Sequence, residues 1–185
     1  MRANCQHMMS ILYAPASYTH ASHLPEALIH GGIDCLTLRN LWIIRQCQLS
    51  HLPPTWQSRD ETLTQLLSLW HRIPHTAHLI GGYLLRNQLL QRGALLMSDP
   101  RLLAFISLPL PCRVNLDTVR SDPINTASYG AAFILSQFPT LPQALRQRLW
   151  LHFPAETAFE PIPVAKTLNH INLLRMALTY ANHYY

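Results

Sequence analysis

Apolar residues recur along the chain every three or four positions, and strict alternation of apolar and polar residues is scarce. Spacings of three and four place side chains on one face of an α helix, whereas alternation is typical of a half-buried strand. The clearest such stripe consists of Leu63, Leu66, Leu67 and Trp70. The pattern therefore predicts a mainly α fold with little or no β structure.

Helix boundaries are marked by short polar residues and by prolines. A capping box at Ser58–Glu61 predicts the start of the helix that carries this stripe, and Pro74 ends or kinks it. Asp99–Pro100 has the cap and the first-turn proline of a short helix, and Asn125 or Thr126 opens another. Altogether we expect six to eight helices, within residues 34–53, 58–73, 75–92, 99–108, 125–138, 140–153 and 164–183.

The faces of these helices can be assigned from the same spacing. In the helix that follows a cap at Asp34, one face carries Leu38, Leu41, Trp42, Arg45 and Leu49, and such an apolar face normally packs on a core. The helix near 75–92 is expected to place Leu79, Tyr83 and Leu90 inward and to end at Gly93. Small residues indicate close helix contacts rather than a phosphate loop at Gly81–Gly82 and at Ala127, Gly130 and Ala131.

The length of 185 residues suits one domain with its own core. No internal repeat or long linker divides it, so we expect a single helical domain over residues 1–185, with residues 1–12 as a candidate disordered segment. A short strand near Val114 is the one exception expected to the helical pattern. The fourteen prolines favour an irregular array of helices over a smooth bundle.

The composition favours a protein that binds partners. Hydrophobic residues make up 49% of the chain and charged residues only 12%, so apolar surface is expected to face outward. The net charge is +5, and all basic side chains except Lys166 are arginines, which pair well with carboxylates or phosphates. The arginines are spread along the chain rather than gathered in a stripe, which favours an acidic protein surface. A small arginine-rich nucleic-acid-binding regulator is the alternative, and salt-dependent binding would distinguish it.

Candidate chemistry is sparse. Most acids are explained as helix caps or first-turn residues, and the chain has no nucleophile elbow, phosphate loop or dinucleotide fingerprint. His71, His75 and His78 have a spacing that zinc could use, but Pro74 interrupts it and no carboxylate lies between them. We therefore predict no catalytic residue, no metal site and no cofactor.

The cysteines and the apolar segments bear on compartment. Cys5, Cys35, Cys47 and Cys112 have no C-x-x-C spacing and are expected to be reduced, buried thiols. The apolar stretch 8–14 is too short for a signal peptide, and the one at 102–112 is too short to span a membrane. A cytosolic protein is the expectation.

Three segments together resemble the SctK proteins of type III secretion systems, which are also called OrgA, MxiK or PscK, and the middle segment is closest to the OrgA branch. Pro15–His20 with His23–Pro25 resembles their P-A-x-Y-x-H…L-P motif. The middle match comprises Arg72–Pro74, Ala77–Gly81, Leu85–Arg86 and Arg92–Leu96, and the carboxy-terminal match comprises Tyr129–Leu135, Phe138–Pro139 and Arg148–Pro154.

The resemblance implies a non-enzymatic adaptor of the sorting platform, in the cytoplasm at the inner-membrane base of the secretion apparatus. In that family the protein links the inner-membrane ring protein SctD to the platform protein SctQ, which carries SctL and the ATPase SctN. No cofactor, nucleic acid or membrane insertion is implied.

Two candidate protein-binding surfaces combine aromatic and basic side chains, as interface hot spots do. One is the front motif, with Pro15, Tyr18 and His20, and the other is the strip Arg146, Arg148 and Trp150. We expect reversal of both arginines to glutamate to weaken assembly without disturbing the fold.

Overall fold

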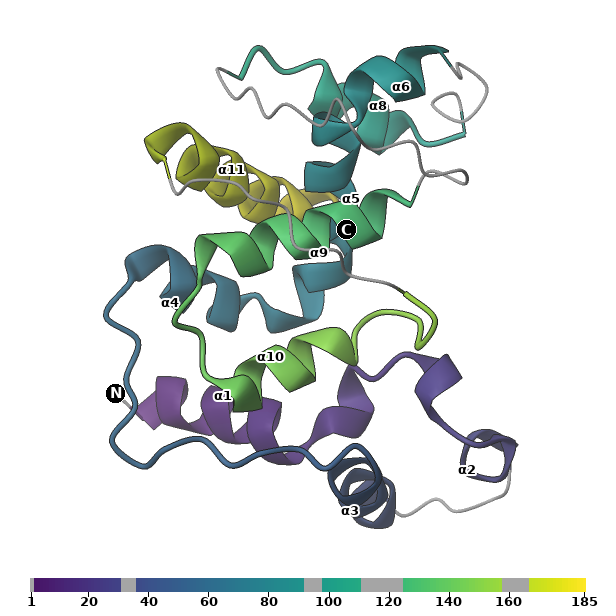
Figure 1. Cartoon of the computed structure of the whole chain (residues 1–185), viewed down its shortest axis with the longest axis vertical. Helices are drawn as coiled ribbons and strands as arrows, with labels where there is room; N and C mark the ends of the chain where they lie inside the picture. The colour runs from purple at the N-terminus through teal and green to yellow at the C-terminus, as the bar shows by residue number, and fades with distance from the viewer. Residues whose placement is uncertain (1, 31–35, 92–97, 111–124, 158–166) are drawn as a thin grey trace. The chain divides into compact units, whose positions relative to one another are not determined.

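The computed structural model describes residues 2–30, 36–91, 98–110, 125–157 and 167–185 (Figure 1). In these ranges all regular structure is helical, which confirms the mainly α class. The α helices are α1 (Arg2–Tyr13), α2 (Glu26–His30), α3 (Leu36–Gln46), α4 (Glu61–Ser68), α5 (Ile73–Leu84), α6 (Arg86–Gln91), α8 (Pro100–Ile106), α9 (Thr126–Gln137), α10 (Gln143–Trp150) and α11 (Leu168–Tyr184). Three short 3-10 helices are η1 (Pro15–Ser17), η2 (Ala21–His23) and η3 (Trp70–Arg72).

Contacts divide the chain into two compact units, the first of residues 1–71 with 140–157 and the second of residues 72–139 with 158–185. The single domain expected over residues 1–185 stays a prediction. The cap expected at Asp34, the helix end at Gly93 and the strand near Val114 lie outside the described residues, as do Cys35 and Cys112. No helix in the described ranges is long and apolar enough to cross a membrane.

In the first unit, α1 packs against α10, α3 and α4. Ile11 and Leu12 are buried in this core, and the Nε2 of His7 donates a hydrogen bond to the carbonyl of Leu67 at 2.6 Å. Tertiary contacts of this kind stabilise a short helix, and α1 covers most of the segment 1–12 that was a candidate for disorder.

The second unit is built around α5, which packs against α9, α11 and α8 (Figure 1). Its contact with α9 is very close, as the small residues predicted. A Cβ at Gly81 would overlap the backbone carbonyl of Thr126, and a Cβ at Gly130 would overlap that of Ala77. Only glycine therefore fits at these two positions of the crossing.

Caps confirm two of the predicted helix starts. The side chains of Asp99 and Asn125 accept hydrogen bonds from the first turns of α8 and α9. At α4 the cap is Asp60, which accepts from the N–H groups of Thr62 and Leu63, whereas the sequence pattern placed the start at Ser58. Asp60 takes this role because its carboxylate reaches two of the orphan donors that begin the helix.

Two apolar faces differ from the prediction. The helix expected over residues 75–92 is interrupted at Leu85, so the helical spacing of apolar residues starts again in α6. As a result Leu89 is buried, whereas Leu90, which was expected to face inward, is 61% exposed. In α3, Leu38 and Leu41 are 56% and 46% exposed, and Ile43 on the opposite side is buried. Leu49 is buried, but it lies beyond the end of α3 and after a turn at Gln48, whose φ is 47°, so it no longer shares the face of Leu38.

Candidate functional site

The front motif and the segment 148–155 meet in the first unit, and we call residues 15–25 and 148–155 together the motif junction. The backbone N–H of His20 donates to the carbonyl of Leu151 at 2.7 Å. The Nε2 of His23 donates to the carbonyl of Phe153 at 2.8 Å, and the N–H of Ala155 donates to the Ser22 hydroxyl at 2.8 Å. Two segments more than 120 residues apart in sequence thus form one continuous structure.

Tyr18 lies at the centre of the junction and is buried. Its hydroxyl donates to the carbonyl of Ile11 at 2.6 Å, and its ring stacks on His152 with 4.8 Å between centroids. Trp70 completes the cluster in a T-shaped arrangement, with 5.9 Å between its ring centroid and that of Tyr18. Burial raises the pKa of Tyr18 well above its usual range. Tyr18 is therefore a core residue that joins α1 to the junction.

His152 is the second buried ring of this cluster. Only 6% of it is exposed, and burial, together with the nearby His71, lowers its pKa from 6.5 to about 3. Its Nε2 has no hydrogen-bond partner among the described residues. The imidazole is consequently neutral at physiological pH and packs as an aromatic ring.

Arg148 points into the first unit, with 2% of it exposed. Its guanidinium donates to the carbonyls of Leu12 (Nη2, 2.9 Å; Nε, 3.2 Å), Ser50 (Nη1, 2.9 Å) and Ala144 (Nη1, 2.8 Å). Leu12 belongs to the last turn of α1, where carbonyls lack partners within the helix and attract a positive charge. Burial lowers the pKa of Arg148. Arg148 thus stabilises the end of α1, and its burial makes a reversal to glutamate expected to disturb the fold, contrary to the expectation from the sequence.

The remaining predicted site residues differ in how far they are exposed. Pro15 is buried, while His20 is exposed and its Nδ1 lies 2.9 Å from the Ser22 hydroxyl. Arg146 is half-buried and donates from Nε to the carbonyl of Leu141 at 2.9 Å. Trp150 is 44% exposed. The structure therefore leaves His20, Arg146 and Trp150 as the predicted residues with accessible surface.

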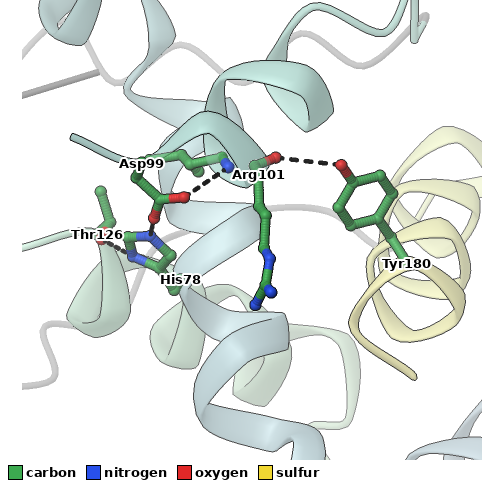
Figure 2. A network of polar contacts seen from close by, with 6 residues as sticks. His78, Asp99, Arg101, Thr126 and Tyr180 are labelled. Carbon is green, nitrogen blue, oxygen red and sulfur yellow. Dashed lines mark hydrogen bonds and ion pairs between the residues drawn. The ribbon is translucent and has the colours of Figure 1, made fainter. Parts of the chain in front are cut away.

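A polar network in the second unit was not predicted from the sequence. His78 lies between Thr126 and Asp99, with its Nδ1 2.6 Å from the Thr126 hydroxyl and its Nε2 2.9 Å from Asp99 Oδ2 (Figure 2). The other carboxylate oxygen of Asp99 accepts from the N–H of Leu102 at 2.9 Å. Burial raises the pKa of Asp99, but the hydrogen bonds from Leu102 and His78 offset this, and the pKa is lowered overall. Nothing in the sequence indicated this partner for His78, because Asp99 was already explained as a helix cap.

Hydroxyl, imidazole and carboxylate in this order also occur in hydrolases, where the hydroxyl is the nucleophile. Here Thr126 is the first residue of α9 and Asp99 is the cap of α8, so His78 on α5 joins the starts of two helices (Figure 2). The arrangement fits a structural role, since both oxygens of Asp99 and both nitrogens of His78 are engaged within the unit.

Metal-ligating side chains are not gathered in the described ranges. There, no group of three or more histidine, cysteine, aspartate or glutamate residues is arranged to hold a metal ion. Of the predicted trio, His71 is exposed in η3 and His78 is engaged as above. Cys47 is a free, half-buried thiol whose pKa is raised by burial.

Comparison with known proteins gives a family for the chain. Residues 8–183 match the bacterial type III secretion apparatus proteins OrgA and MxiK. The chain is similar to the oxygen-regulated invasion protein OrgA from three strains of Salmonella typhimurium, with 28% identity over 178 residues that cover 94% of this chain and 86% of the relative. No solved structure matches it significantly. Since the family match spans both units and both halves of the motif junction, the chain belongs to the OrgA/MxiK family of bacterial type III secretion apparatus proteins.

Proposed function

We propose that this protein is a non-enzymatic cytoplasmic adaptor of a type III secretion sorting platform, and that it links an SctD-type inner-membrane ring protein to an SctQ-type platform protein. The family match over residues 8–183 carries this proposal, because it makes the chain a component of the secretion apparatus. The name of its Salmonella relative refers to invasion, which fits a virulence apparatus. Through the platform protein the adaptor would also be connected to SctL and the ATPase SctN.

The use of polar side chains supports a binding role. Three side chains at the motif junction have a shifted pKa or a charge, namely Tyr18, His152 and Arg148. They pack in the core, and Tyr18 and Arg148 donate hydrogen bonds to backbone carbonyls. Outward positions instead carry apolar side chains, among them Leu38, Leu41 and Trp150. Exposed apolar side chains on a weakly charged chain are typical of surfaces that contact other proteins.

A bridging assay tests the proposal. The cytoplasmic domain of the ring protein is immobilised, and capture of the platform protein is measured with and without this chain. We expect capture only when the chain is present, because it contacts both proteins. Capture that is independent of the chain would contradict the proposal. Binding of the chain to DNA that falls steeply between low and moderate salt would favour the nucleic-acid alternative instead.

Trp150 and Arg146 provide a directed version of this assay. Both lie at accessible positions on α10, one helical turn apart, and large aromatic side chains are frequent interface anchors. We expect Trp150→Ala combined with Arg146→Glu to reduce bridging at least tenfold while circular dichroism stays unchanged. Bridging at the wild-type level by this folded variant would remove α10 from the interface.

A further inference from the structure

Helix α3 presents an apolar stripe to solvent. With about 100° of rotation per residue, Leu38, Leu41, Trp42 and Arg45 fall within about 100° of the helix circumference. Leu38 and Leu41 are exposed, Trp42 is half-buried, and Arg45 is exposed at the end of the stripe. We call these four residues the α3 stripe. Its apolar members lie at the spacing that normally packs on another element.

The opposite side of α3 holds the helix in this orientation. Ile43 is fully buried, and the side chain of Asn40 accepts a hydrogen bond from the backbone N–H of Ala16 at 2.8 Å. The helix packs there against η1 and α1. Rotating the α3 stripe inward would break these contacts and leave the N–H of Ala16 without its partner. The exposure of the stripe is therefore built into the first unit.

Charge indicates what would cover it. Neither α1 nor α3 contains an aspartate or glutamate, whereas α3 carries Arg39 and Arg45. Arg45 follows Leu41 by one helical turn, and within the described ranges it has no ion-pair partner. A partner that buries the leucines would bring its own side chains beside this guanidinium, and a carboxylate is the group that arginine pairs with best.

We propose that the α3 stripe is the docking site for an amphipathic helix of a partner protein, with apolar residues at three- and four-residue spacing that cover Leu38 and Leu41 and an acidic residue that pairs with Arg45. The packing is that of two helices that bury apolar ridges against each other. This inference rests on the proposed function, since the helix belongs to one of the two proteins that the adaptor joins.

The apolar half of the proposal is tested with the full chain and the purified ring-protein domain and platform protein. Leu38→Ser combined with Leu41→Ser should weaken binding of one of the two proteins at least tenfold and leave the other unchanged. Leu90→Ser is the matched control, because Leu90 is an exposed leucine on α6 of the second unit. It should bind both proteins as the wild type does. Unchanged binding of both proteins by the folded double variant would overturn the inference while the proposed function stands.

The charged half is tested at Arg45. Arg45→Glu should weaken the same partner at least tenfold, whereas Arg45→Lys should retain most of the binding, and the difference should shrink at high salt. A photoreactive amino acid at position 41 should cross-link to a helical segment of that partner that contains aspartate or glutamate. A cross-link to a second copy of this chain, or to a segment without acidic residues, would overturn the inference. A wild-type chain that binds neither protein would overturn both the inference and the proposed function.

Discussion

At the scale of single residues, the first unit depends on a buried arginine rather than on an ion pair. Arg148 supplies donors to the carbonyls of Leu12, Ser50 and Ala144. Removal of the guanidinium leaves buried carbonyls unsatisfied, so Arg148→Met should lower the free energy of unfolding by about 2–4 kcal/mol, measured by urea denaturation. Arg146→Met is the matched control on the same helix, and its effect should stay below about 1 kcal/mol. Equal losses in the two variants would contradict the role given to Arg148.

His152 makes stability depend on pH. Its pKa is about 3 in the folded protein and 6.5 ordinarily, so the unfolded chain binds a proton below pH 6.5 that the folded chain does not. The contribution of His152 to the free energy of unfolding is fully present above about pH 6.5. It is lost as the pH falls toward 3, with a slope of up to about 1.4 kcal/mol per pH unit. His152→Phe, which keeps an aromatic ring beside Tyr18 and Trp70, should reduce this slope in urea titrations at several pH values. An identical pH dependence in the variant would show that His152 is not responsible.

At the scale of elements, the crossing of α5 and α9 depends on two glycines. Gly81 faces the backbone of Thr126 and Gly130 faces that of Ala77, and backbone atoms cannot move aside as a side chain can. Alanine at either position should destabilise the second unit by about 1–3 kcal/mol or more in thermal unfolding. Gly82→Ala is the control, because its added methyl group meets only the flexible side chain of Leu102. A loss for Gly82→Ala as large as for the other two would contradict this explanation.

The elements also show which features local sequence can predict. The caps at Asp99 and Asn125 were predictable, because a cap depends on a few neighbouring residues. The outward faces of α3 and α6 were not, because the breaks near Gln48 and Leu85 shift the helical register and packing decides which side is buried. The apolar residues of α3 that the spacing predicted to face the core are thus the exposed α3 stripe.

At the scale of the whole molecule, sequence resemblance identified the family, and composition identified the kind of residue found at interfaces. Neither distinguishes an aromatic or basic side chain in the core from one at the surface. Tyr18 and Arg148 proved to be buried, while Trp150 is exposed, although all three are residue types that are common in interface hot spots. The contact between residues 15–25 and 148–155 required the folded structure, since it joins distant segments through hydrogen bonds that each involve a backbone group.

The mass of the assembled complex tests the adaptor role most directly. Light scattering on a size-exclusion column would measure the ring-protein domain, the platform protein and this chain, alone, in pairs and together. The adaptor role predicts one species that contains all three proteins, and no complex of the ring and platform proteins when this chain is left out. Elution of this chain as a separate species from both proteins would contradict it.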